Sequence, residues 1–200
     1  RKVGIIAVGL DEGDYLIGAA LTDGQHDVML FSDGGKTVRF NEDPEQGGVR
    51  PMGRQAAGVK GMELEPGQRV IAMLVAEDET QSVLTASENG YGKRTSITEY
   101  TLHRRGGKGM ISMLQSERNG KVVAATLVRP ADEIMLITDK GVLVRTRVSE
   151  IRELGRATQG VTLIALDNGA KLSGLQRIVE NDTPAEGEDP TAGEAGSEGN

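Results

Sequence analysis

The sequence predicts an all-β fold, a propeller-like array of repeated four-stranded units. Matching segments return with a period of about 51 residues, which is the spacing between Gly58, Gly109 and Gly160. Helical periodicity is nearly absent, and 28 of the 200 residues are glycine, which favours many tight turns. A four-stranded unit of this kind cannot bury both of its faces alone, so we expect the units to stack on one another.

The first element of each repeat is a predicted β-hairpin. Three segments align without gaps: VMLFSDGGKTVRF (28–40), VLTASENGYGKRT (83–95) and IMLITDKGVLVRT (134–146). Each has an apolar strand, a turn that contains glycine, and a second strand that carries an arginine (Arg39, Arg94 or Arg145). Asn89-Gly90 is a strong hairpin signal, because both residues tolerate positive φ.

A glycine-containing loop and a further strand follow each hairpin. The loops, called loops 1, 2 and 3 below, are GRQAAGV (53–59), RRGGKGM (104–110) and GRATQGV (155–161). They align on Arg54, Arg105 and Arg156. The strands expected after them are RVIAMLVA (69–76), KVVAATLV (121–128) and KLSGLQRI (171–178). YLIGAALT (15–22) is similar to the last strand of an earlier copy.

The repeats divide residues 1–180 into a partial unit and three further units. The partial unit covers 1–24, and the others cover about 25–77, 78–129 and 130–180. Residues 181–200 hold six acidic residues, no Lys or Arg, and no large apolar residue. Such a segment cannot bury enough surface to offset its ordering entropy, so we expect a disordered acidic tail. The only helical turn we expect lies near SEIREL (149–154).

Composition limits the class of protein. The chain has no Cys, which excludes disulfides, thiolate zinc sites and thiol catalysis. No run of about 18 apolar residues and no signal peptide is visible, so we expect a cytoplasmic protein with no membrane partner. The chain begins with Arg1 rather than Met, which suggests a fragment or a processed product. The net charge is −7, but without the six acids of the tail the remaining chain carries about −1.

Loop 2 holds the densest positive cluster of the chain, in the stretch HRRGGKGM (103–110). Glycines let a phosphate backbone approach closely, while Arg and Lys attract it. If the units stack in a disc, equivalent loops lie along one edge and form a basic band for duplex DNA. No aromatic residue interleaves the cluster, so stacking on single-stranded bases is not expected. The candidate DNA-binding residues are Arg39, Arg54, Lys93, Arg94, Arg104, Arg105, Gly106, Gly107, Lys108, Gly109, Arg145, Arg147 and Arg156.

A structural interpretation of the same residues stays open at this point. The glycines can serve turn geometry alone, and single arginines at strand ends are commonly surface charges. Repetition in register favours a function, but repeat proteins also repeat their structural residues.

Several of these motifs resemble one protein family. HRRGGKG (103–109) is similar to the GyrA box, Q-R-R-G-G-[K/R]-G, of the C-terminal domain of the DNA gyrase A subunit, with His103 in place of Gln. NGYGKRT (89–95), ITDKGVLVRTRVSEI (137–151) and GRATQGV (155–161) resemble later repeats of that domain, and the resemblance covers roughly residues 1–180.

The resemblance implies a β-pinwheel whose outer rim binds and wraps duplex DNA. It also implies partners within an A2B2 gyrase that introduces negative supercoils, namely the ATP-hydrolysing B subunit together with the N-terminal region of gyrase A. The cleaving tyrosine and the ATP site of such a topoisomerase lie outside the segments matched here. We therefore expect no catalytic residues, no metal site and no cofactor in this chain.

Two alternatives from other groups of proteins remain at this point. One is the related C-terminal domain of the topoisomerase IV A subunit, and the other is a propeller-like scaffold that binds proteins. An enzyme has little support, because the only histidines are His26 and His103. GGKT (34–37) resembles the end of a phosphate-binding loop, but Leu30 occupies the position of the required first glycine.

Overall fold

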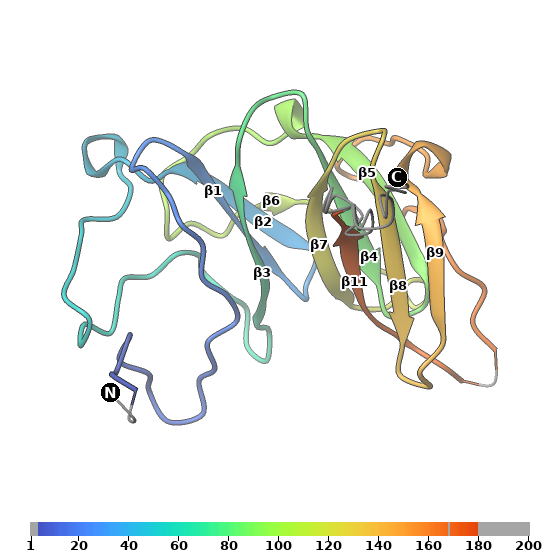
Figure 1. The fold of residues 1–200 in the computed structure, drawn as a ribbon, viewed down its shortest axis with the longest axis horizontal. Helices are drawn as coiled ribbons and strands as arrows, with labels where there is room; N and C mark the ends of the chain where they lie inside the picture. Colours follow the sequence, from blue (N-terminus) through green and yellow to red (C-terminus); the bar gives the residue numbers. More distant parts are fainter. Residues whose placement is uncertain (1–3, 168, 180–200) are drawn as a thin grey trace, which may run out of the picture.

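The protein folds into three antiparallel sheets that stand side by side as blades (Figure 1). The computed structural model describes residues 4–167 and 169–179. Blade 1 contains β1 (Asp27–Ser32), β2 (Lys36–Asn41) and β3 (Val70–Ala76), blade 2 contains β4 (Ser82–Ser87), β5 (Tyr91–Ser96) and β7 (Val122–Val128), and blade 3 contains β8 (Glu133–Thr138), β9 (Leu143–Arg147) and β11 (Leu172–Ile178). The predicted propeller-like, all-β fold is confirmed.

The three predicted hairpins form with one shared register. Val28 pairs with Phe40, Val83 with Thr95, and Ile134 with Thr146, which are equivalent positions in the alignment. Each hairpin turn contains a glycine with positive φ, namely Gly35, Gly90 or Gly141. Turn geometry sets hairpin register, so equal turns place equivalent side chains on equivalent faces of the three blades.

The fourth strand of a blade comes from the following repeat. β6 (Met110–Ile111) pairs with β2 of blade 1, and β10 (Val161–Thr162) pairs with β5 of blade 2. The sequence predicts four strands within each unit, whereas the structure has three strands and one short strand lent by the neighbour. Blade 3 has three strands among the described residues. Loops 2 and 3 therefore lead directly into strands that tie one blade to the previous one.

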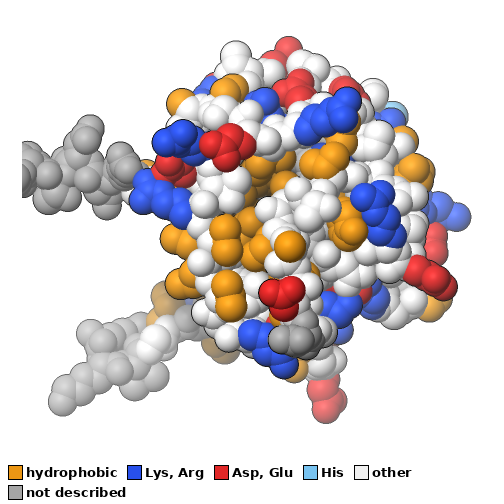
Figure 2. Space-filling view, turned by 90° about the vertical axis from the view of Figure 1, so that its right-hand side faces the viewer, with side chains coloured by type: hydrophobic (Ala, Val, Ile, Leu, Met, Phe, Trp, Pro, Cys, Tyr) orange, Lys and Arg blue, Asp and Glu red, His pale blue; other side chains and the backbone are white. Residues whose placement is uncertain are grey.

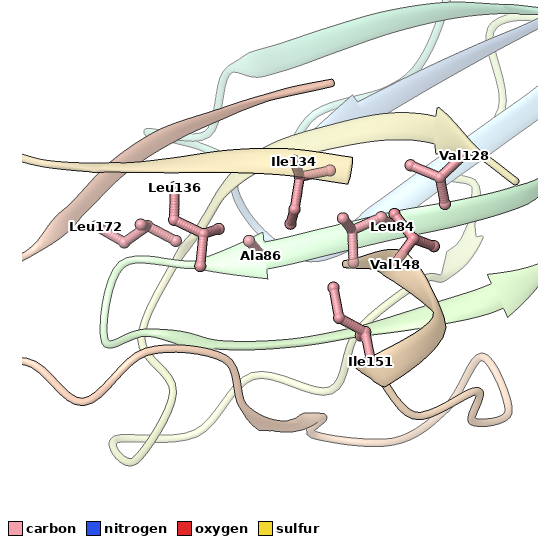
Figure 3. Packing of buried hydrophobic residues seen from close by; sticks show 8 residues of the cluster. All are labelled: Leu84, Ala86, Val128, Ile134, Leu136, Val148, Ile151 and Leu172. Carbon is pink, nitrogen blue, oxygen red and sulfur yellow. The ribbon is translucent and has the colours of Figure 1, made fainter. Parts of the chain in front are cut away.

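Apolar side chains pack between successive blades. Leu84 and Ala86 of β4 meet Ile134 and Leu136 of β8 in a cluster that Figure 3 shows with Val128, Val148, Ile151 and Leu172. A second cluster joins blades 1 and 2, where the rings of Phe31 and Tyr100 make an edge-to-face contact with centroids 6.3 Å apart. The core is thus mainly aliphatic, and each inter-blade contact buries what a single sheet would leave exposed.

One-turn 3-10 helices follow the second strand of every hairpin. They span Pro44–Gln46, Ile97–Glu99 and Val148–Glu150. The sequence predicts a helical turn only near 149–154, so the first two were missed. Asp43 and Ser96 cap the first two turns by accepting a hydrogen bond from a backbone N–H, a local signal that is available in the sequence. Among the described residues, no helix is long and apolar enough to cross a membrane.

The segment before β1 does not form the expected strand. YLIGAALT (15–22) has no regular secondary structure, and Tyr15 and Leu21 are exposed. Figure 1 shows the segment as an irregular path beside blade 1. A strand needs neighbours for its backbone N–H and C=O groups, and the other strands of that partial unit are absent from the described residues. The predicted acidic tail (181–200) lies outside the described residues.

Blade 3 leaves apolar side chains on its outer face. Leu143 is 60% exposed, and Ile137, its partner in the β8–β9 register, is partly exposed. Figure 2 shows hydrophobic side chains gathered on this side of the molecule, with Lys, Arg, Asp and Glu around them. The same face of blades 1 and 2 is covered by the next blade, because Met29 and Leu84, which align with Met135, lie inside the two inter-blade clusters.

Candidate nucleic-acid interface

Loop 2 lies across blade 1 immediately before β6. Its backbone is held by hydrogen bonds from the Gly106 N–H to the Gly61 carbonyl (2.5 Å) and from the Glu63 N–H to the Gly107 carbonyl (2.8 Å). The His103 N–H donates to the carbonyl of Arg39 (2.9 Å). These hydrogen bonds therefore hold the backbone of the loop on the surface of the preceding repeat.

Two glycines of loop 2 have conformations that other residues rarely adopt. Gly106 has φ 82° and Gly109 has φ 73°. A Cβ on Gly109 would stand 2.5 Å from the Thr37 carbonyl oxygen, and one on Gly160 would stand 2.8 Å from the equivalent oxygen of Gly92. In loops 2 and 3 the repeated glycine therefore allows close packing of the loop on the blade beneath it, whereas no atom lies within 4 Å of a Cβ added to Gly58.

Arg104 and Lys108 are the exposed cations of loop 2. Within the described part of the chain, neither side chain has a hydrogen-bond or ion-pair partner. The stem of Arg104 lies over Gly47, where an added Cβ would come within 3.0 Å of Arg104 Cγ. A hollow of about 430 Å³ opens beside them, lined by Val38, His103, Arg104, Gly107, Gly109 and Met110. Both positive charges are available to an anion that approaches from solvent.

The side chain of Arg105 is directed toward the backbone of the preceding repeat and not toward solvent. Its Nε donates to the Gly48 carbonyl (2.8 Å) and its Nη1 donates to the Lys60 carbonyl (3.2 Å), so the guanidinium binds backbone of the preceding repeat. Arg156 in loop 3 binds the carbonyls of Glu99 (3.1 Å) and Ile111 (2.6 Å) in the same way. Arg54 in loop 1 is exposed and donates to the Ile6 carbonyl (3.0 Å). The aligned arginines thus share a backbone-binding contact.

Arg39 and Arg94 are not the exposed charges that the sequence predicts. Arg39 is 8% exposed, pairs with Asp27 (2.7 Å) and donates to the carbonyls of Ile97 (3.0 Å) and Tyr100 (3.1 Å) in the 3-10 turn of the next repeat. Arg94 binds the equivalent carbonyl of Ile151 (2.7 Å). The expectation of a surface band at these two positions is wrong, because their guanidinium groups lie between blades.

Lys93 is also buried rather than exposed. Its side chain has no exposed surface, and Nζ donates to the carbonyls of Gly155 (2.6 Å) and Arg156 at the start of loop 3. Val38 and Val144 occupy the aligned positions in the other hairpins. Burial lowers the pKa of the Lys93 ammonium to about 8, and the nearby positive charge of Arg156 acts in the same direction, while Glu99 opposes the shift.

We expect Lys93 to lose its proton near pH 8, well below its ordinary value of 10.5. Between these two pH values the unfolded chain holds this proton and the folded chain does not. The contribution of Lys93 to the free energy of unfolding therefore rises with pH across that window. The measurement is the 13Cε chemical shift of lysine-labelled protein from pH 6 to 11, with Lys93→Met to identify the resonance. A midpoint above about 10 would contradict the prediction.

Arg145 and Arg147 lie on β9 of blade 3 and not beside loop 2. Both pair with Glu133 on the neighbouring strand, and Arg147 also lies 3.8 Å from Glu150. Arg147 is 71% exposed. These two predicted residues are separate from the cluster formed by Arg104 and Lys108.

Exposed cations outside the predicted set include three that lie just before or after the loops, namely Arg50, Lys60 and Arg152. Arg50 lies two residues after Gly48, and Lys60 itself supplies the second carbonyl that Arg105 binds. Arg152 occupies the position in the third repeat that Arg50 holds in the first. None of the three has a side-chain hydrogen-bond or ion-pair partner in the described part of the chain. The equivalence of Arg50 and Arg152 was visible in the sequence, just before the start of loops 1 and 3.

One group among the described residues has the composition of a metal site. Ligand atoms of Asp23, His26 and Glu42 lie within 4.8 Å of one another. However, His26 Nδ1 lies 2.8 Å from Asp23 Oδ1, and Glu42 Oε1 accepts the N–H groups of Gly24 and His26. These atoms already satisfy the turn before β1, so the group is explained as a hydrogen-bonded turn.

Comparison with known proteins identifies relatives along most of the chain. A family model described as "DNA gyrase C-terminal domain, beta-propeller" matches residues 1–23, 26–77, 81–129 and 132–178. The DNA gyrase A subunit of Pseudomonas aeruginosa is 52% identical over 189 residues, which cover 94% of this chain and 20% of that protein. Its counterpart from Escherichia coli (strain K12) is 49% identical over 180 residues, covering 90% and 20%. The chain spans about a fifth of the length of these relatives.

Solved structures agree with the fold. A structure of a DNA gyrase A C-terminal domain superimposes with a TM-score of 0.79 at 29% identity, covering 89% of this chain and 59% of that one. The C-terminal domain of a DNA topoisomerase IV superimposes with a TM-score of 0.80 at 23% identity, covering 86% and 52%, a likeness of fold alone. With three repeats matched by one family model and half of the residues shared with gyrase A proteins, the chain belongs to the DNA gyrase C-terminal domain family.

Proposed function

We propose that this chain binds duplex DNA through its sugar–phosphate backbone and bends the duplex along successive loops. The observation that carries the proposal is the pair of exposed cations Arg104 and Lys108, which have no partner among the described residues, on a glycine-rich loop of fixed backbone. Arg50, Lys60 and Arg152 extend the positive surface to the neighbouring repeats. Contacts of this kind attract phosphates and carry little information about base sequence.

The family supplies the context of the proposed binding. The relatives are DNA gyrase A proteins, and this chain matches about a fifth of their length. We infer that the domain holds a DNA segment against the rest of an A2B2 topoisomerase in the cytoplasm, whose other parts cleave DNA and hydrolyse ATP. Wrapping in one direction would then support ATP-dependent negative supercoiling. In this proposal the chain contributes binding and geometry, and no catalytic side chain.

The experiment is a salt series of duplex-DNA affinity for the unaltered chain. If phosphate contacts dominate, the logarithm of the association constant falls linearly with the logarithm of salt concentration, with a slope of about −0.9 per phosphate contact. Duplexes of different sequence and equal length should bind with similar affinity. Absence of binding at about 50 mM salt would reject the proposal and favour a protein-binding scaffold.

A further inference from the structure

The two arginines of loop 2 differ in exposure and in hydrogen-bond partners. Arg104 is exposed, whereas the neighbouring guanidinium of Arg105 spans the carbonyls of Gly48 and Lys60, two points of the preceding repeat. Gly48 is itself buried, so its carbonyl is a fixed acceptor. A planar guanidinium with donors in a rigid fork can bridge two such acceptors, while an ammonium offers a single charged centre.

The contact is repeated with the period of the fold. Arg156, Glu99 and Ile111 lie 51 residues after Arg105, Gly48 and Lys60, and they form the same two hydrogen bonds. A backbone hydrogen bond recurs with the same offset. The Glu63 N–H donates to Gly107 (2.8 Å), and the Leu114 N–H donates to Thr158 (3.0 Å). Loops 2 and 3 are therefore each held on the previous repeat at three equivalent points.

These contacts link the loops in series. The segment that accepts from Arg105 includes Lys60, directly after loop 1, and the segment that accepts from Arg156 includes Ile111, directly after loop 2. The position of each of these two loops is therefore fixed relative to the residue that directly follows the preceding loop. The spacing and orientation of the exposed cations in and beside successive loops, such as Lys60 after loop 1 and Arg104 in loop 2, depend on these contacts.

We propose that Arg105 and Arg156 are positioning residues that set the geometry between successive DNA-contacting loops and thereby the curvature imposed on the duplex. The proposal rests on the DNA binding proposed above. A duplex resists bending, so it follows a curved path only where the contacting groups are held in place. Loss of one clamp should let a loop adjust to straighter DNA while its phosphate contacts persist.

The experiment compares Arg105→Ala, Arg105→Lys and Arg156→Ala with the matched neighbour Arg104→Ala in the otherwise unaltered chain. Three quantities are measured: the salt slope of duplex affinity, the bend of a bound duplex by energy transfer between its labelled ends, and the unfolding transition. All binding is measured well below the unfolding temperature of each variant. Arg105→Lys keeps the charge without the fork, so it remains informative if the alanine variant does not fold.

For Arg105→Ala, Arg105→Lys and Arg156→Ala we expect salt slopes close to that of the unaltered chain and a bend reduced by roughly half. Arg104→Ala should show the opposite pattern, a slope reduced by about 0.9 with the bend of the bound duplex retained. A further variant, Arg105→Gln, should show the same reduced bend as Arg105→Ala, because one amide group cannot donate to both carbonyls as the guanidinium does.

Two results would overturn the positioning role. A salt slope reduced by about one in both Arg105→Ala and Arg105→Gln, with the bend retained, would make Arg105 a phosphate ligand. Reduced stability with an unchanged bend would make it only a structural contact. Failure of the unaltered chain to bind DNA would instead reject the proposed function itself, and this result is visible before any variant is made.

Discussion

Replacing Arg104 and Lys108 together by alanine is expected to lower duplex-DNA affinity about ten- to hundredfold at fixed low salt. Both side chains are exposed and lack partners in the described structure, so their removal costs the fold little and removes two charges from the proposed contact surface. The salt slope should become shallower by about 2, since each lost phosphate contact contributes about 0.9. The measurement is affinity by fluorescence anisotropy across a salt series.

The matched control removes two other exposed cations. Arg69 directly precedes β3 of blade 1 and Lys140 lies in the hairpin turn of blade 3, so neither belongs to loop 2, and their replacement by alanine changes the net charge by the same amount. This control should retain the salt slope of the unaltered chain. Equal losses in both double variants would show that net charge, and not the placement of cations on loop 2, governs binding.

Replacing Arg39 by methionine is expected to reduce the free energy of unfolding by about 3–5 kcal/mol. The substitution leaves Asp27 without its cation and removes a donor from the carbonyls of Ile97 and Tyr100 in blade 2. Breaking a buried ion pair costs more than the pair contributes, because the remaining carboxylate stays desolvated. The measurement is equilibrium unfolding in urea at neutral pH.

The control for this prediction is Arg147→Met on the outer face of blade 3. Arg147 is 71% exposed and its pairs with Glu133 and Glu150 are 3.8 Å long, so a change within about 0.5 kcal/mol is expected. Combining Arg39→Met with Asp27→Asn should recover part of the loss, because no charge is then left unpaired. A cost below about 1 kcal/mol for Arg39→Met alone would argue against the inter-blade role of this side chain.

Most of the secondary structure was predictable because it depends on local patterns. The hairpins at 28–40, 83–95 and 134–146 appear with the expected strands and turns, since apolar alternation and turn glycines act over a few residues. YLIGAALT (15–22) has the same local pattern and forms no strand. A strand also needs neighbours to pair with, and that requirement cannot be read from its own residues.

The candidate site was predictable only in part. Arg104 and Lys108 are exposed as expected, but Arg39, Lys93 and Arg94 lie inside the structure. The alignment of Arg39 with Arg94 was evidence of a repeated role, and that role is contact between repeats, whereas Lys93 has valines at its aligned positions. For Arg105 and Arg156 the same alignment marks a contact with backbone carbonyls of the previous repeat.

The sequence by itself determined the repeat, the hairpins, the glycines of the loops and the family. The first three follow from residue types at fixed spacings, and the family follows from the resemblance of the loop and hairpin motifs to those of a known domain. Only the tertiary structure decided that blades 1 and 2 take their fourth strand from the following repeat and which of the repeated cations face solvent. The physical reason lies in the partners of those cations. Arginine and lysine are held here largely by backbone carbonyls, and every residue carries one, so no pattern of side chains could reveal which carbonyls fold into reach.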